Sequence, residues 1–312
     1  MKSVRYRLLW VQLLLSTTLL AQVSVPVTPK QEKIITITGV RFAYPLVQKW
    51  IDDYNKTNPE VQIIIESRGT GDPTKYDILI EAYEPEADKK VTRDYCYVGR
   101  YAVLPVANSR SAFAKEYASK GLSQNLIKQL FFHNIFADKN DQAVIKAPYT
   151  VYTRLQKAGA PITFSKHFGY QQKDIRGKSI AGADEHLLKA VLRDSVGLTY
   201  LPLNLLFDQK SETPIEGIAI LPVDLNGNGK VSEDEKFYNN LPTILQRLEE
   251  KDQKDIANVP IEYVHLSLDK KSSNAEAVAF IKWVVQHGTQ DLHAFGFMKP
   301  EPHRQATEKQ NE

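Results

Sequence analysis

The segment 224–235, DLNGNGKVSEDE, carries the residue types of a calcium loop at the required spacing. In a twelve-residue EF-hand loop, positions one, three, five, seven, nine and twelve supply oxygen ligands, and position six is glycine because the chain turns sharply there. The matching residues are Asp224, Asn226, Asn228, Gly229, Lys230, Ser232 and Glu235. Lys230 would offer its carbonyl oxygen, and Glu235 both oxygens of its carboxylate. The spacing predicts a calcium site; the alternative is a solvated Asn-Gly-rich turn of similar sequence.

The surroundings of this loop differ from those of a calcium sensor. A strand-like run, GIAILPV, precedes the loop where an EF-hand has a helix. The chain has one such loop rather than a pair, so no hydrophobic groove can open between paired loops. Only Asp224 and Glu235 contribute charge, which favours a weak affinity of about 10⁻⁴ to 10⁻³ M. We therefore expect a structural calcium site rather than a switch.

The first residues of the chain are typical of an export signal. Residues 1–21 combine a basic start with an apolar core, Leu8 to Ala21, and Ala21 is a small residue suited to cleavage. A membrane anchor is the alternative, although the apolar run is shorter than the ~20 residues that a span needs. Cys96 is the only cysteine, so neither an intrachain disulfide nor a lipid anchor near the cleavage site is expected. These features predict a periplasmic protein.

Charge excludes one class of partner. Residues 1–21 contain three of the 40 Lys and Arg and none of the 37 Asp and Glu, so the rest of the chain is formally neutral. A nucleic-acid-binding protein would show a basic face or stripe, and the sequence has none. We expect no nucleic-acid partner.

Strand-like and helix-like runs alternate along the remaining chain. The β-branched run 34–40 is followed by a helical run over 43–55, in which Val47, Trp50, Ile51 and Tyr54 form one apolar stripe. The strand-like runs are 34–40, 61–67, 76–82, 95–108, 149–154, 196–203, 217–223 and 259–269. Such alternation predicts an α/β fold with mostly parallel sheets covered by helices.

Two stretches near the ends of this region share residues with a known family. Phe42, Pro45, Lys49 and Trp50 lie near the start, and Trp283, Gly288, Gly296 and Phe297 near the end. In these positions the chain resembles the phosphate-binding proteins of ABC phosphate importers. The resemblance implies the two-lobed periplasmic binding protein fold (type II), each lobe a helix-covered, mostly parallel sheet. Lobe 1 would comprise 33–106 and 259–300, lobe 2 would comprise 107–258, and 301–312 would be a polar tail.

The resemblance also directs attention to three places where an oxyanion could bind. Backbone N–H groups at helix N-termini hold such anions, and an Arg adds a bidentate contact. The first place is Arg41 and Phe42, the second is the turn with Ser67, Arg68 and Thr70, and the third is Arg154 with Gly159. Alternatively, Arg41 and Arg68 would be solvated surface residues.

Several of these positions depart from the family's pattern. Ala158 and Ala160 stand where the family has hydroxyl residues, and Pro161 removes one N–H donor. The family also accepts the proton of phosphate with an Asp after the third strand. Here that region offers Asp77, Glu81 or Glu84, none in register with the pattern. The extra arginines either compensate for the missing donors or indicate a larger anion.

Together these residues predict an exported solute-binding protein that captures phosphate or a related oxyanion for an ABC importer. We expect a monomer without enzymatic activity, because the chain has no G-x-S-x-G elbow, no Walker loop and no transition-metal motif. The main alternative is an interaction or scaffold protein that keeps the fold without the anion site. A hydrolase of phosphate esters would need a nucleophile or paired metal ligands that the sequence does not show.

Overall fold

The computed structural model describes residues 33–66, 72–84, 86–133, 144–251, 253–272 and 274–301. Within them, hydrogen-bonded strands follow the order β2-β1-β3-β9-β4-β7-β5-β6, with β8 paired to β4. The strands are β1 (Lys33–Gly39), β2 (Val61–Ile65), β3 (Ile78–Glu81), β4 (Arg93–Asn108), β5 (Thr150–Arg154), β6 (Lys178–Ile180), β7 (Gly197–Pro202), β8 (Ile218–Ile220) and β9 (Ile261–Asp269). The α-helices are α1 (Tyr44–Asn55), α2 (Ala87–Thr92), α3 (Ala112–Lys120), α4 (Gln124–Phe131), α5 (Gly159–His167), α6 (Asp184–Arg193), α7 (Leu241–Glu250) and α8 (Ala275–His287).

Local sequence explains the first of these elements. In β1, Ile35 and Ile37 are fully buried, whereas Ile34, which precedes them, is exposed. This is expected because successive side chains of a strand point to opposite faces. In α1, Pro45 lies in the first turn, where a missing N–H costs no helical hydrogen bond. The predicted stripe is confirmed, because its four members are all buried: Val47, Trp50, Ile51 and Tyr54. Helix and strand thus bury their apolar faces together.

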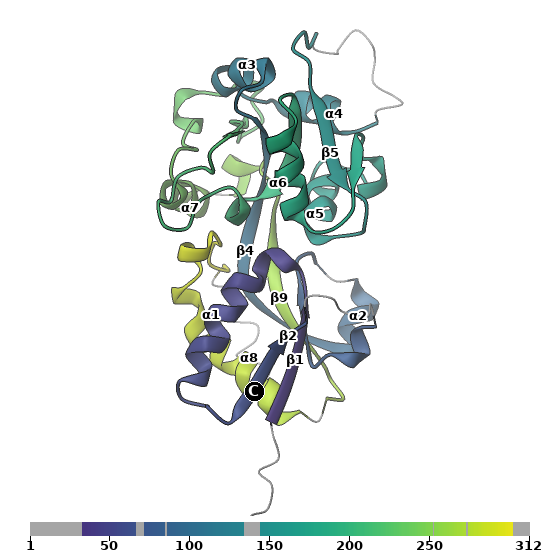
Figure 1. Cartoon of the computed structure of the whole chain (residues 1–312), viewed down its shortest axis with the longest axis vertical. Coiled ribbons are helices and arrows are strands. Elements are labelled where there is room, and N and C mark those ends of the chain that lie inside the picture. Colours follow the sequence, from purple (N-terminus) through teal and green to yellow (C-terminus); the bar gives the residue numbers. More distant parts are fainter. Residues whose placement is uncertain are drawn as a thin grey trace, which may run out of the picture. The chain divides into compact units, whose positions relative to one another are not determined.

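Strands β4 and β9 connect two lobes (Figure 1). β4 pairs antiparallel with β9 from Arg93 to Ala102, then with β7 from Val103 onward. β1, β2 and β3 therefore belong to one lobe, and β5 to β8 to the other. The predicted parallel pairing is found in the outer strands, β1 with β2 and β3, and β5 with β6 and β7. The pairs made by the crossing strands are antiparallel. The fold is α/β and two-lobed, as the sequence predicts.

Two clusters of buried side chains form the core. The larger contains Trp50 of α1 and Phe280 of α8, and continues to aromatic residues of the second lobe such as Phe164. The smaller surrounds β7, α6 and α7, with Leu201, Leu187 and Ile244 among its members. Continuous packing of this kind fixes the ends of β1, β3 and β5, from which the site is built.

No helix in the described ranges is both long and apolar enough to cross a membrane. The predicted signal peptide, 1–21, lies outside the described residues. The same holds for the polar tail except Glu301, which accepts a hydrogen bond from Arg100 at 2.6 Å.

Candidate functional site

A cavity of about 590 Å³ lies where connections from the two lobes face each other. One wall comes from the end of β1 and the end of β3, and the other from the β5–α5 connection and the start of α6. Its polar and backbone lining includes Arg41, Glu81, Tyr83, Arg154, Gln156, Lys157, Ala158, Gly159, Gly182 and Asp184. Three cationic and two acidic side chains line it, so its formal charge favours an anion. We call it the Arg154 cavity.

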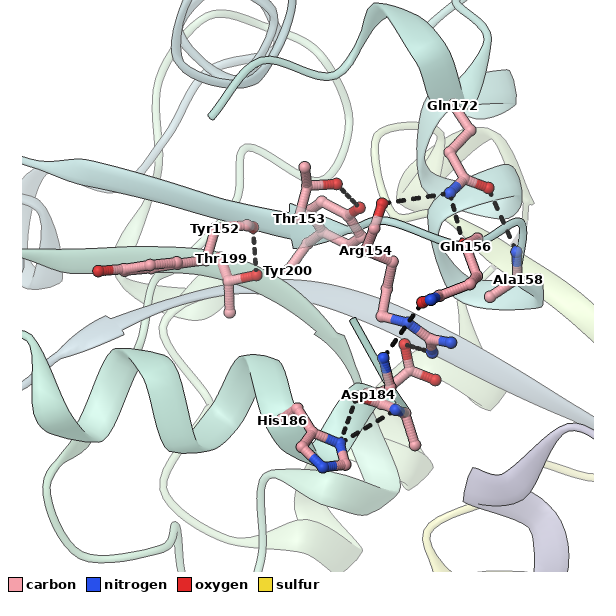
Figure 2. Close-up of polar contacts among 12 residues, drawn as sticks. Tyr152, Thr153, Arg154, Gln156, Ala158, Gln172, Asp184, His186, Thr199 and Tyr200 are labelled. Carbon is pink, nitrogen blue, oxygen red and sulfur yellow. Dashed lines mark hydrogen bonds and ion pairs between the residues drawn. The ribbon is translucent and has the colours of Figure 1, made fainter. Parts of the chain in front are cut away.

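Arg154, the last residue of β5, is held by an ion pair. Its Nη1 donates to Oδ1 of Asp184 at 2.9 Å, and the two side chains are only 11% and 7% exposed (Figure 2). The Nε atom is buried and has no acceptor within the described part of the chain. A guanidinium has five N–H donors, so this pairing leaves donors for a ligand in the cavity.

Asp184 is the acid of this pair, and no sequence pattern marked it as a site residue. It is the first residue of α6, 30 positions from Arg154 in the chain. Burial raises the pKa of Asp184, and the attraction of the Arg154 guanidinium opposes that rise. The sequence does place Asp184 at the start of a helical run. That position predicts a helix N-terminus, but it does not predict which strand end lies beside it.

Helix α5 presents its N-terminus to the same cavity. The side chain that forms hydrogen bonds there is Gln172 rather than a hydroxyl residue of the helix start. Gln172 Oε1 accepts the N–H of Ala158 at 3.2 Å, and Gln172 Nε2 donates to the carbonyl of Gln156 at 2.9 Å (Figure 2). The N–H groups of Gly159 and Ala160 have no acceptor among the residues described, as is usual in a first helical turn. Pro161 has no N–H to offer. Two backbone donors therefore remain for an anion.

Gly159 has a steric reason to be glycine. A Cβ at this position would lie 2.9 Å from Cβ of Ala82 and 3.2 Å from its carbonyl oxygen. The same region is tied together by Tyr101, whose hydroxyl donates to the Ala82 carbonyl at 2.5 Å and lies 2.7 Å from the hydroxyl of Thr163. The start of α5 thus contacts the end of β3 directly, and only a glycine permits that distance.

The two residues of the first predicted anion-binding place lie in different surroundings, Arg41 in the cavity and the Phe42 side chain in the core. Arg41 is exposed and lines the Arg154 cavity. The Phe42 side chain is 1% exposed, lies 4.8 Å from Tyr101 between ring centroids, and does not line the cavity. The Phe42 carbonyl accepts a hydrogen bond from Asn204 at 2.7 Å. The Phe42 side chain is therefore a core residue that fixes the start of α1, and the predicted anion contact of the backbone at Arg41 and Phe42 stays a prediction.

The remaining predicted positions have mixed outcomes. Ser67, Arg68 and Thr70 lie outside the described residues. Asp77 does not line the cavity, and its carboxylate accepts the N–H of Thr36 at 2.8 Å. Of the three candidate acids, only Glu81 lines the Arg154 cavity, and its carboxylate accepts the hydroxyl of Ser267 at 2.7 Å.

The predicted calcium loop has two deeply buried carboxylates. Asp224 is 1% and Glu235 is 2% exposed. The Asp224 carboxylate accepts the N–H groups of Gly227, Asn228 and Gly229 at 2.9, 3.1 and 2.7 Å. Glu235 accepts the N–H of Leu225 at 2.9 Å and both the N–H and the hydroxyl of Ser232 at 2.8 Å. Within the described ranges, no Lys, Arg or His forms an ion pair with either carboxylate.

The loop is anchored to other parts of the second lobe. Asn258, buried just before β9, donates to the carbonyl of Asp224 at 2.8 Å. Val231 packs so closely on Gly121 that a Cβ there would lie 2.2 Å from a Val231 methyl group. The described residues contain no group of three or more His, Cys, Asp or Glu side chains suited to a metal. The loop has two carboxylates; its other predicted ligands are amide, hydroxyl and carbonyl oxygens, which suit calcium.

No protein-family model and no curated protein sequence matches the chain. Several solved structures are similar to it. A phosphate ABC transporter substrate-binding protein from Clostridium perfringens, solved with bound phosphate, is 12% identical with a TM-score of 0.58 over 86% of this chain and 100% of that chain. An ABC-type phosphate transport receptor from Vibrio cholerae is 11% identical with a TM-score of 0.55, covering 85% and 100% of the two chains.

A third similar structure is a regulatory domain. The CcmR regulatory domain of Synechocystis PCC6803, in complex with 2-PG, is 12% identical with a TM-score of 0.50, covering 80% of this chain and 95% of that chain. At such identities the likeness shows the fold alone. The chain has the type II periplasmic binding protein fold, which substrate-binding proteins and regulatory domains share.

Proposed function

We propose that this protein binds a phosphate-like oxyanion in the Arg154 cavity and delivers it to an ABC importer. The observation that carries the proposal is the buried guanidinium of Arg154, which lies beside an α-helix N-terminus in a cavity between two lobes. Arg154 would donate to the anion through the N–H groups not used by Asp184. The N–H groups of Gly159 and Ala160 would add two further donors at the positive end of the α5 dipole.

Asp184 would set the protonation state of the ligand. Near neutral pH, phosphate retains a proton and sulfate does not, so a carboxylate in the cavity accepts a hydrogen bond from phosphate and repels sulfate. The carboxylate lies 2.9 Å from the donor atom of Arg154, within reach of a ligand that this arginine holds. This assigns to Asp184 the proton-accepting role that the sequence analysis sought near β3.

The transport part of the proposal rests on the fold and on the first residues. Strands β4 and β9 connect the lobes, and a hinge in such strands allows closure around a ligand. The leader 1–21 directs the chain to the periplasm, where it acts as a monomer without catalysis. The substrate-binding protein from Clostridium perfringens and the phosphate transport receptor from Vibrio cholerae have this fold.

We further propose that the 224–235 loop binds one structural calcium ion. Asp and Glu are almost never fully buried unless they are paired or bind a metal, and Asp224 and Glu235 are both buried without a cationic partner in the described ranges. Asp224, Asn226, Asn228, Lys230, Ser232 and Glu235 would hold the ion. The ion would stabilise the second lobe without contacting the oxyanion.

Calorimetric titration of the mature protein with phosphate, sulfate and a phosphate ester, each with and without calcium, tests both proposals. We expect phosphate to bind more tightly than sulfate, and calcium to leave the affinity unchanged. Arg154→Ala should weaken phosphate binding between about tenfold and about a hundredfold, because hydrogen bonds to a charged group are lost. Arg193→Ala, at an exposed arginine on the last turn of α6, is the matched control. An Arg154→Ala protein with wild-type affinity would disprove the site.

The second candidate function is an interaction or scaffold protein. The observation in its favour is the N-terminus of α5, where Gln172 already accepts the N–H of Ala158 and alanines replace the hydroxyl residues. No binding of any of the three anions, by a protein that still unfolds cooperatively, would favour this candidate over transport.

A further inference from the structure

A second cavity, of about 710 Å³, adjoins the Arg154 cavity. Four residues line both: Tyr83 from the first lobe and Arg154, Lys157 and Ile162 from the second. Because these residues line both cavities, a ligand that binds Arg154 in the first cavity also borders the second. Its volume falls within the range of about 300–1,000 Å³ that is usual for sites of small organic ligands.

The wall of the second cavity next to Arg154 is apolar and exposed. Leu155 follows Arg154 in the chain, lines this cavity, and has 61% of its side chain exposed. Few large apolar residues of the described chain are exposed to this degree, and the others do not line either cavity. Tyr83 and Ile162 extend the apolar wall. An exposed leucine that lines a ligand-sized cavity offers apolar surface to an apolar group of a ligand.

Cationic side chains outnumber acidic ones in the second cavity, with Arg154 and three lysines against Glu84 and Glu86. Lys157 lies with its Nζ 6.0 Å from the ring centroid of Tyr83, so it contacts the first lobe across the opening. Lys166 and Lys173 also line the second cavity, and none of the three lysines forms an ion pair with a described residue. The combination of an apolar wall and cations suits an anion that carries an apolar body.

A bare tetrahedral oxyanion would leave the exposed leucine uncovered. We propose that the ligand is a phosphate monoester with a compact apolar or aromatic body. Its phosphate lies at Arg154 and the N-terminus of α5, and its body lies against Leu155 and Tyr83 in the second cavity. This inference rests on the proposed anion site and names the class of ligand that the site selects.

The test compares phenyl phosphate with inorganic phosphate by calorimetric titration of the mature wild-type protein. The titration is made at about pH 5, below the second pKa of about 6 of a phosphate monoester, where both anions keep a proton for Asp184 and carry the same charge, so the difference in affinity reports the organic body. We expect phenyl phosphate to bind about tenfold more tightly, since its ring covers the apolar wall. Leu155→Ser should remove most of this advantage and leave the affinity for inorganic phosphate within about twofold of wild type.

Val91→Ser is the matched control, because Val91 is 72% exposed and lines neither cavity. It should leave both affinities unchanged. Equal affinity of the wild-type protein for the two anions would overturn the inference while the proposed anion site stands. An advantage of phenyl phosphate that survives Leu155→Ser would also overturn it. If neither anion binds, the proposed function fails, and the inference fails with it.

Discussion

The Arg154 cavity and the 224–235 loop both bury carboxylates, but they compensate the charge in different ways. In the cavity, Asp184 forms an ion pair with Arg154, which comes from another strand end. In the loop, Asp224 and Glu235 accept only hydrogen bonds from residues of the loop itself, within eleven or fewer positions of each other. One region is therefore assembled from distant segments, and in the other all of these hydrogen bonds come from a single short segment.

This difference has an energetic consequence. A buried ion pair is neutral as a unit, so removing one partner leaves an uncompensated charge. The loop carries two negative charges whose backbone donors supply only partial positive charge, so a divalent cation would complete it. We therefore expect the cavity to respond to substitution of either partner, and the loop to respond to calcium.

The largest expected effect is on the ion pair. Arg154→Ala should lower the free energy of unfolding by about 3 kcal/mol, because Asp184 would remain buried without a cation. The double variant Arg154→Ala/Asp184→Asn should recover a large part of that loss. Urea denaturation of the four proteins of this double-mutant cycle measures the coupling. Additive effects of the two substitutions would mean that the pair is not coupled, and the contrast with the loop would disappear.

A somewhat smaller effect is expected when the loop loses one ligand charge. Calcium at about a hundred times its Kd should stabilise the wild-type protein by about 2.7 kcal/mol and raise its melting temperature. Glu235→Gln should abolish this rise, since the bidentate carboxylate is lost. Glu233→Gln is the control, because the Glu233 side chain is 89% exposed and pairs only with Lys236. A melting temperature insensitive to calcium in the wild type would show that the loop is a solvated turn.

The smallest expected effect is the pH dependence of the ion pair. Burial raises the pKa of Asp184 above its ordinary value of 3.8, so the folded protein holds this proton more tightly than the unfolded chain does. The stability that this group contributes is therefore fully present below pH 3.8 and is lost as pH rises through the folded-state pKa. Unfolding free energies of the wild type relative to Asp184→Asn should thus decrease with rising pH over an interval that begins near pH 3.8. A difference that stays constant over this interval would contradict the raised pKa.

Sequence patterns predicted residues that the structure brings to one cavity, and what they missed has a physical cause. Arg154, Gly159 and Arg41 all line the cavity, although their role in binding stays a prediction. The ring of Phe42 packs on Tyr101 in the core, which leaves only its backbone for the predicted contact. Asp184 was not identified as a site residue, because its role depends on α6 starting beside the end of β5. A spacing rule cannot give that proximity when 30 residues separate the two.

The sequence by itself determined the elements and the loop, because their patterns are local. The apolar stripe of α1 follows helical periodicity, and the twelve positions of 224–235 place their own donors around Asp224 and Glu235. Only the tertiary structure decided which acid faces Arg154, that Gln172 accepts the N–H of Ala158 just before α5, and that Leu155 is exposed beside the anion cavity. These contacts join segments brought together by strand order and core packing. Such long-range proximity comes from the burial of the whole chain rather than from any one stretch of it.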